Sequence, residues 1–222
     1  RMRRDEVINN HIQVGDVIVG FASYGKASYE NLYNGGMGSN GLTSARHDML
    51  SHCYSNDYKE SYDNSLPEDL VYSGPYRLTD PTEVEGVDVG KLILSPTRTY
   101  LPVMVPIFKE LRHKIHGMIH CSGGAQTKVL HFIDKLHIVK DNMFELPPLF
   151  RMIQSASGTD WKEMYKVFNM GHRLEIYTDI ASAETMMEIA RSFNIESQII
   201  GHVEPSDSKH LTIKSQYGIF QY

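Results

Sequence analysis

The residues best suited to chemistry lie in the segment IHGMIHCSGGAQTKVLHF, residues 115–132. Its first half predicts a short apolar strand and its second half a helix, with Gly123 and Gly124 in the turn between them. Such connections present free backbone N–H groups that bind anions. His120 stands at the end of the predicted strand, where ligands collect in α/β sheets. A histidine there can act as acid, base or hydrogen-bond donor, although a purely structural histidine fits the same position.

The neighbouring histidines and cysteine suggest two other chemistries. His113, His116 and His120 would form a metal site if they shared a helix face with a further ligand. The segment predicts a strand, and no carboxylate or cysteine completes a ligand set, so we expect no metal there. Cys121 adjoins His120, but successive strand residues point to opposite faces. A buried thiol is therefore expected in place of a Cys–His nucleophile.

Two other element ends carry polar residues that could contact an anion. Ser39, Asn40 and Gly41 precede a predicted helix, where a side chain could cap the helix or an anion could bind. Thr97 and Arg98 precede another predicted helix. A cation at a helix N-terminus opposes the helix dipole, so Arg98 points to either a bound anion or a buried carboxylate partner.

Three weaker candidates complete this set. Thr127 follows the glycine pair, but the spacing is not that of a phosphate-binding P-loop. Asn169 and Gly171 precede a predicted strand, where they could form an ordinary turn or bring the backbone close to a ligand. From the residues alone, these glycine-marked ends favour binding of a phosphorylated small molecule.

Composition limits the class of protein. The chain has 222 residues, 41% hydrophobic and 22% charged, with a formal net charge of −5. This excludes general binding to nucleic acid or to anionic membranes. Two cysteines indicate a reducing compartment, and no apolar run is long enough to span a bilayer. The chain begins RMRRDEVINNH, without Met, so we expect a fragment of a longer protein.

Hydrophobic periodicity predicts an α/β (α+β) domain with one mixed sheet covered by helices. Residues 55–91 predict little regular structure. Ser182 and Asp160 are expected to cap helices. The predicted strands are 14–23, 115–120, 197–204, 210–215 and 217–222, and residues 169–179 predict a turn followed by a strand. The predicted helices are 42–54, 100–111, 125–137, 147–158, 161–168 and 182–194.

Several motifs, in this order, give the chain a resemblance to a known family: GDVIVGFAS, GSNGLTSAR, LSPTRTYLPVM, IHGMIHCSGG, PPLFRMIQ and EMYKVFNMGHRLEI. The chain resembles the C-terminal domain of phosphoribosylformylglycinamidine cyclo-ligase, also called aminoimidazole ribonucleotide (AIR) synthetase, over nearly its whole length. The resemblance implies that residues 1–13 trail a missing N-terminal domain and that 14–222 form the C-terminal domain. In this family the N-terminal domain supplies most of the ATP and Mg²⁺ site and the main homodimer contacts.

The resemblance also implies a reaction and roles for residues. The cytoplasmic family enzyme uses ATP to close the imidazole ring of formylglycinamidine ribonucleotide in purine biosynthesis. His120 matches the histidine before the family's glycine turn and is expected to polarise the formyl oxygen or to handle a proton. The remaining expected substrate and phosphate contacts are Ser39, Asn40, Gly41, Thr97, Arg98, Gly123, Gly124, Thr127, Asn169 and Gly171.

The sequence departs from the family pattern at several places. Gly38 stands where the family has a histidine, and Ala125 where it has a third glycine. Residues 27–37 look like an insertion, and residues 55–91 diverge. These departures leave two alternatives open. One is another ATP-dependent member of the superfamily, such as formylglycinamidine synthetase, selenophosphate synthetase, thiamine-phosphate kinase or a hydrogenase-maturation protein. The other is a non-catalytic module that binds a phosphorylated purine intermediate.

Overall fold

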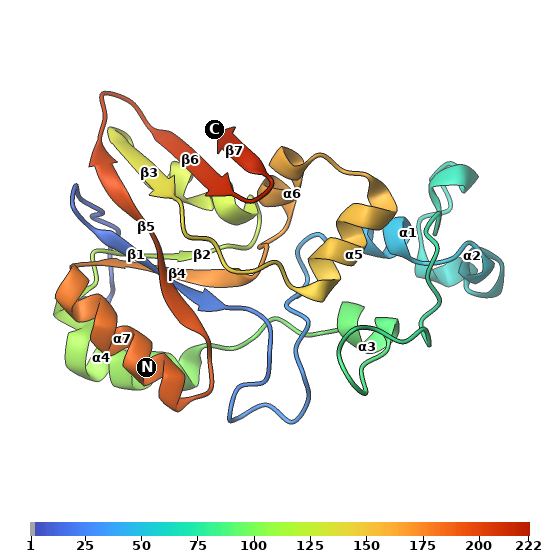
Figure 1. Cartoon of the computed structure of the whole chain (residues 1–222), viewed down its shortest axis with the longest axis horizontal. Coiled ribbons are helices and arrows are strands. Elements are labelled where there is room, and N and C mark those ends of the chain that lie inside the picture. The colour runs from blue at the N-terminus through green and yellow to red at the C-terminus, as the bar shows by residue number, and fades with distance from the viewer. Residues whose placement is uncertain (1–2) are drawn as a thin grey trace.

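A seven-stranded mixed sheet forms the centre of the molecule (Figure 1). The computed structural model describes residues 3–222. The strand order is β2-β4-β1-β5-β3-β6-β7, and all neighbours are antiparallel except β3 and β6. The predicted single domain with a mixed sheet is confirmed. The strands are β1 (Val17–Ala22), β2 (Gly117–His120), β3 (Leu136–Lys140), β4 (His172–Thr178), β5 (Ser197–Pro205), β6 (His210–Ser215) and β7 (Gly218–Gln221).

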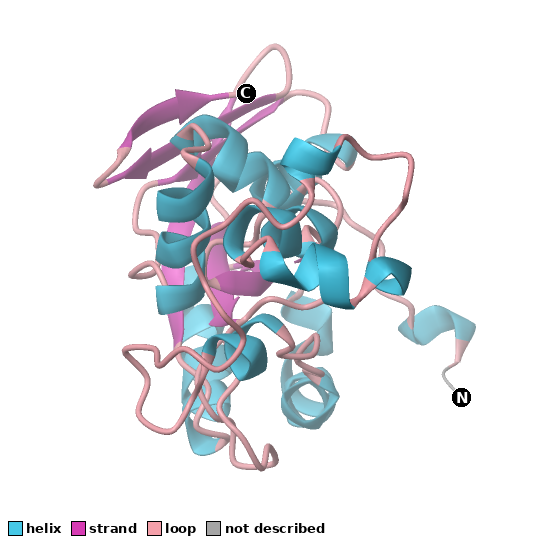
Figure 2. Cartoon of the chain, turned by 90° about the vertical axis from the view of Figure 1, so that its right-hand side faces the viewer, coloured by secondary structure: helices cyan, strands magenta, loops and turns pink. Residues whose placement is uncertain are grey.

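Helices cover both faces of the sheet. Helices α4 and α7 lie side by side on one face, and most of the others gather in a lobe beside the sheet (Figures 1 and 2). The α-helices are α1 (Leu42–Met49), α2 (Cys53–Asp57), α3 (Val89–Ile93), α4 (Leu101–Leu111), α5 (Pro148–Ser157), α6 (Trp161–Val167) and α7 (Ile180–Ser192). The 3₁₀ helices are η1 (Arg4–Glu6), η2 (Lys59–Ser61), η3 (Glu68–Leu70), η4 (Arg112–Lys114) and η5 (Ala125–His131).

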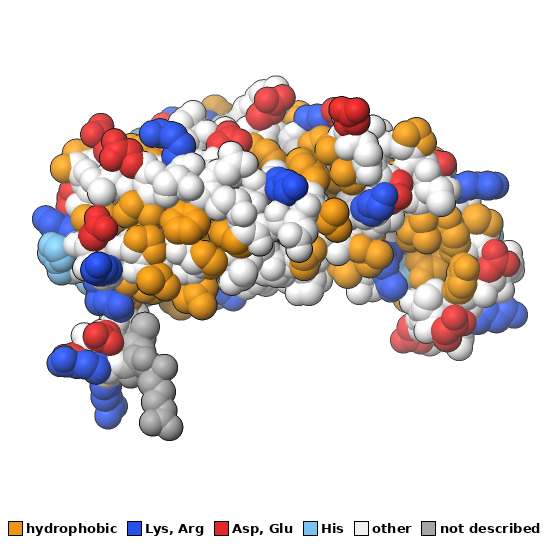
Figure 3. Space-filling model, turned by 90° about the horizontal axis from the view of Figure 1, so that it is seen from below, with side chains coloured by type: hydrophobic (Ala, Val, Ile, Leu, Met, Phe, Trp, Pro, Cys, Tyr) orange, Lys and Arg blue, Asp and Glu red, His pale blue; other side chains and the backbone are white. Residues whose placement is uncertain are grey.

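Alternation along the strands divides the interior into two cores. Val19 and Phe21 of β1 pack on the face covered by α4 and α7. Ile18 and Ala22 face the other core, which includes residues of α1, α5 and α6. The outer side of α4 stays open: Leu101 is 65% exposed, and apolar side chains gather over this part of the surface (Figure 3).

Three predicted helices differ from the structure at their ends. The helix expected over 42–54 ends at Met49, because Leu50 is extended and forms a bridge with Tyr76; α2 then begins at Cys53. The helix expected after the glycine pair is the 3₁₀ helix η5, whose first residue, Ala125, has a φ of +42°. Helix α7 is capped by Asp179, not Ser182.

Strand β3 is absent from the sequence prediction. Its segment, LHIVK, ends in Lys140, a residue type that is rarely buried, yet the side chain is fully enclosed. The short β2 has a covered outer edge: the His11 N–H donates to the His116 carbonyl at 2.7 Å, and the Met118 N–H donates to Asn10 Oδ1 at 2.8 Å. Within residues 3–222, no helix is long and apolar enough to cross a bilayer.

Candidate functional site

The chain leaves the sheet at the end of β2 and winds into a tight turn. The Ser122 N–H donates to the His120 carbonyl at 2.7 Å, and the Ala125 N–H donates to the Ser122 carbonyl at 2.7 Å. Gly124 has a φ of +85°, which favours glycine. The Thr127 hydroxyl donates to the Gly124 carbonyl at 2.8 Å, so it holds the turn from within.

The loop formed by residues 38–41 lies against this turn. A Cβ on Gly123 would be 3.8 Å from Asn40 Oδ1, while Asn40 Nδ2 donates to the Val167 carbonyl at 3.1 Å. Gly41 has a φ of +77°, and a Cβ there would lie 2.6 Å from Cε1 of Phe168. The structure therefore brings two of the glycine-marked ends together, and Ser39 is exposed beside them.

His120 and Cys121 point to opposite faces of the sheet, as predicted. Cys121 is buried, at 1% exposure, and His120 is largely exposed. Partial burial lowers the pKa of His120, and the nearby charges of Arg173 and Lys128 lower it further. The imidazole is therefore neutral at pH 7, and it can accept or donate a proton at its ring nitrogens.

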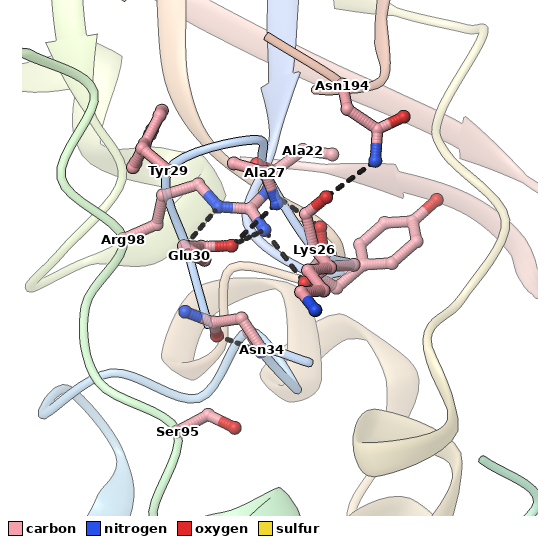
Figure 4. A network of polar contacts seen from close by, with 12 residues as sticks. Ala22, Lys26, Ala27, Tyr29, Glu30, Asn34, Ser95, Arg98 and Asn194 are labelled. Atoms are coloured by element: carbon pink, nitrogen blue, oxygen red, sulfur yellow. Dashed lines mark hydrogen bonds and ion pairs between the residues drawn. The ribbon is translucent and has the colours of Figure 1, made fainter. Parts of the chain in front are cut away.

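For Arg98, the sequence predicted either a bound anion or a buried carboxylate partner. The structure shows a carboxylate partner, Glu30. The Arg98 guanidinium pairs with both oxygens of Glu30, at 2.9 and 2.7 Å. The remaining N–H groups donate to the carbonyls of Ala22, Tyr24 and Gly25, at 2.7–2.9 Å (Figure 4). All five donors are used within the chain, which leaves none for a phosphate. The neighbouring Thr97 is exposed.

The insertion-like loop folds around Arg98. Gly25 and Asn34 form an antiparallel bridge with backbone hydrogen bonds of 2.9 and 2.8 Å, which closes the base of the loop. Glu30 extends from the loop to the guanidinium (Figure 4). The loop is thus an ordered element that is held by one buried ion pair.

Asn169 and Gly171 form a turn that connects several segments. Asn169 Nδ2 donates to the Gly36 carbonyl at 2.8 Å, and its Oδ1 accepts from the Ser23 hydroxyl at 2.6 Å. Its Oδ1 also accepts from the Gly171 N–H at 3.2 Å. Asn169 is 3% exposed, so its side chain fixes the loop at Gly36 against the start of β4.

Sequence reasoning missed a buried ionic cluster beneath the turn. Glu175 of β4 pairs with the Lys140 ammonium and accepts hydrogen bonds from His172 Nε2 and the Tyr177 hydroxyl, both at 2.9 Å. Burial by itself raises the pKa of Glu175, but Lys140 and His172 outweigh it and lower the pKa to about 2. The signal in the sequence is weak: Glu175 and Lys140 are charged residues within segments that also carry apolar strand formers.

Part of this cluster has the composition of a metal site. Ligand atoms of Cys121, His172 and Glu175 lie within 4.8 Å of one another. However, the Lys140 ammonium contacts the same Glu175 oxygen that His172 contacts. This ammonium supplies the positive charge that the carboxylate needs, so the cluster is complete as an ion pair.

Sequence reasoning also missed Arg173, the residue beneath the 38–41 loop. It is 2% exposed, and its Nη2 donates to the carbonyls of Gly36 and Met37, at 3.2 and 2.5 Å. The guanidinium occupies the space above Gly38, where a Cβ would lie 2.5–2.7 Å from its terminal atoms. The sequence offered one indirect signal for Arg173: a glycine at position 38, where the resemblance leads one to expect a histidine.

Comparisons with known proteins show which family the sequence matches. Residues 13–214 match the family model described as AIR synthase related protein, C-terminal domain. The chain is 29% identical over 208 residues to phosphoribosylformylglycinamidine cyclo-ligase of Methanocaldococcus jannaschii, covering 92% of this chain and 49% of that protein. It is 28% identical over 204 residues to the protein of the same name from Methanopyrus kandleri, covering 92% and 48%.

The chain spans about half the length of these curated relatives. Among solved structures, the T. maritima PurL complexed with FGAR is similar, with a TM-score of 0.49, 11% identity, and coverage of 99% of this chain and 29% of that chain.

Proposed function

Because this chain belongs to the family of AIR synthase related C-terminal domains, we propose that it is the C-terminal part of an ATP-dependent cyclo-ligase. The proposed reaction closes the imidazole ring of formylglycinamidine ribonucleotide to give aminoimidazole ribonucleotide. One observation carries the proposal: the 38–41 loop and the turn after His120 meet at the end of β2, beside Arg173. Backbone N–H groups and cations at such a position suit a phosphorylated substrate.

The proposed chemistry requires little from this chain besides binding and proton transfer. A phosphoryl group passes from ATP to the formyl oxygen of the substrate. The amidine nitrogen then attacks the formyl carbon, inorganic phosphate departs with that oxygen, and the nitrogen loses a proton. Neutral His120 can accept this proton or donate a hydrogen bond to the formyl oxygen. The loops at 38–41 and 121–124 would orient the ribonucleotide.

The donor set fits a phosphate better than it fits Mg²⁺. Among the described residues that form the turn and the 38–41 loop, none carries a carboxylate, the ligand type that Mg²⁺ prefers. Glu175 lies below the turn and is already paired with Lys140. We therefore place the Mg²⁺·ATP site mainly in a part of the protein outside this chain. The same proposal includes a cytoplasmic homodimer of the longer protein.

The test is ADP release by the full-length parent with ATP, Mg²⁺ and formylglycinamidine ribonucleotide. His120→Ala is expected to lower kcat by roughly 10²–10⁴-fold, the usual range for loss of a general acid or base. His113→Ala is the matched control, since His113 is exposed on η4. No turnover by a folded parent, or an unchanged kcat in His120→Ala, would contradict the proposal.

The second candidate function is a non-catalytic module that binds a phosphorylated purine intermediate. Gly38 favours it, because the histidine that the family carries at this place is absent and a guanidinium occupies the space. The same experiment separates the two candidates. A module would bind the ribonucleotide, detected by calorimetry, and release no ADP.

A further inference from the structure

Arg173 is a buried cation that lacks a counter-ion. Its side chain is 2% exposed, yet it makes no ion pair with any residue in the range 3–222. The two hydrogen bonds of its guanidinium both come from Nη2 and go to backbone carbonyls. Within the same part of the chain, Nε and Nη1 have no partner. Within residues 3–222, the fully enclosed polar side-chain atoms without a partner are Arg46 Nε and His172 Nδ1, so the free donors of Arg173 reach solvent. A guanidinium stays charged in proteins, and a charge without a counter-ion can bind an anion.

The surrounding backbone is shaped to admit this side chain. Gly38 has a φ of +61°, and a Cβ there would lie 2.5 Å from Nη2 and 2.7 Å from Nη1 of Arg173. Any other residue at 38 would displace the guanidinium. The carbonyls of Gly36 and Met37 hold Nη2, so the position of the charge is fixed before a ligand arrives.

Two cations act on His120, at the end of β2. Both Arg173 and Lys128 are close enough to His120 to lower its pKa. The chain as a whole carries a net charge of −5, so this local excess of cations runs against the average. Arg98 makes the contrast clear, because its buried guanidinium is fully satisfied by Glu30 and three carbonyls.

We propose that Arg173 is a phosphate anchor, whose guanidinium binds a phosphate group of the ligand beside the 38–41 loop and the turn at Gly123–Gly124. The identification of the ligand as a phosphorylated ribonucleotide rests on the proposed function. The phosphate could be the 5′-phosphate of the ribose or the phosphoryl group that ATP supplies. Arg173 has the geometry for either, since a guanidinium binds phosphate through paired N–H donors.

The test measures phosphate-dependent stabilisation and affinity for the 222-residue chain, with ribose 5-phosphate, inorganic phosphate and ATP as probes. Ribose 5-phosphate is expected to raise Tm by several degrees when its concentration is well above Kd. Arg173→Gln should weaken the apparent Kd at least about tenfold, and Arg173→Lys by less. The control is Arg77→Gln, which removes an exposed arginine and should bind as the wild type does.

Gly38→Ala provides a second, independent variant. It retains Arg173 but places a methyl group where the guanidinium lies, so it should weaken phosphate binding as Arg173→Gln does. If Arg173→Gln does not fold, this variant carries the test. A merely structural Arg173 would change the baseline Tm in these variants and leave the shift caused by ribose 5-phosphate intact.

The outcomes separate the anchor from the proposed function. If the chain binds ribose 5-phosphate but not ATP, the anchor holds the ribose phosphate. If it binds ATP but not ribose 5-phosphate, the anchor holds the transferred phosphoryl group. Equal affinity in wild type and Arg173→Gln, or no effect of any probe at tens of millimolar, overturns the anchor. If the full-length parent does not close the ring but binds the phosphate probes in a way that depends on Arg173, only the proposed function is overturned. Ring closure with an unchanged KM in Arg173→Gln overturns only the anchor.

Discussion

The two buried arginines show how one residue type can serve opposite purposes. Arg98 directs all five N–H donors at Glu30 and at backbone carbonyls, so its charge is neutralised inside the fold. Arg173 contacts carbonyls only through Nη2. The first arrangement stabilises structure, and the second retains a charge that a ligand can use.

Arg98→Gln is expected to destabilise the chain by about 3 kcal/mol, because Glu30 would keep a largely buried carboxylate without its partner. Urea unfolding measures this loss. Arg77→Gln, at an exposed site, should change stability by less than about 0.5 kcal/mol. Adding Glu30→Gln to Arg98→Gln should recover part of the loss, and a strictly additive double variant would contradict the pairing.

Glu175 is expected to dominate the acid sensitivity of the fold. Its pKa is about 2 in the folded chain, below the unfolded value of 4.5, so its stabilisation is complete above pH 4.5. This stabilisation is lost as pH falls from 4.5 toward 2, by an amount on the order of 3 kcal/mol. Unfolding free energies measured between pH 3 and 7 should show this slope. In Glu175→Gln the slope should be smaller, with lower stability at pH 7.

The pKa of His120 reports on Arg173. Since the Arg173 charge helps to hold this pKa below 6.5, Arg173→Gln should move it upward, whereas Arg77→Gln should not. NMR titration of the imidazole ring protons measures both. A bound phosphate should also raise the pKa, because an anion stabilises the imidazolium. A His120 pKa identical in wild type and Arg173→Gln would place the two groups too far apart to interact.

At the scale of elements, the start of α1 depends on a glycine, Gly41, at its N-cap. Gly41 has a φ of +77°, and a Cβ there would overlap the Phe168 ring. Gly158, after α5, has a φ of +66° and open space around it. Gly158→Ala should therefore cost about 1 kcal/mol from strain alone. Gly41→Ala should cost a further 1–3 kcal/mol from overlap. Thermal unfolding compares the stabilities of the two variants. An equal loss of stability in both would mean that the Phe168 ring moves aside freely.

Sequence patterns predicted β1 from its continuous apolar run, α5 from its apolar stripe, and also β4 and the hairpin of β6 and β7. They failed where tertiary contacts override local preference. Lys140 obscured β3, because its burial depends on Glu175, a partner 35 positions away. Leu50 ended α1 early, because it forms a bridge with Tyr76.

The candidate site was predictable only in part. His120 and the glycine loops carry local signals, so their convergence could be expected from the sequence. Arg173 and Glu175 carry only weak signals, because their importance lies in what surrounds them: an absent carboxylate in one case, and a buried ammonium in the other. Such relationships require the three-dimensional arrangement.

At the scale of the whole molecule, the chain spans about half the length of its curated relatives. We expect this chain alone to release no ADP from ATP in the presence of Mg²⁺ and formylglycinamidine ribonucleotide, because the residues proposed to bind phosphate at its candidate site offer no carboxylates for Mg²⁺. A coupled assay for ADP, with the full-length parent beside it, measures this. Turnover by the chain alone would show that its own residues hold the nucleotide.

The contact between Gly38 and Arg173 has a consequence for how this protein diverged. The two positions share one small volume, so a side chain at one excludes a large side chain at the other. Homologues with histidine at the first position should therefore have a small residue at the second. An alignment of homologues checks this pairing, and a histidine together with an arginine in one homologue would contradict it.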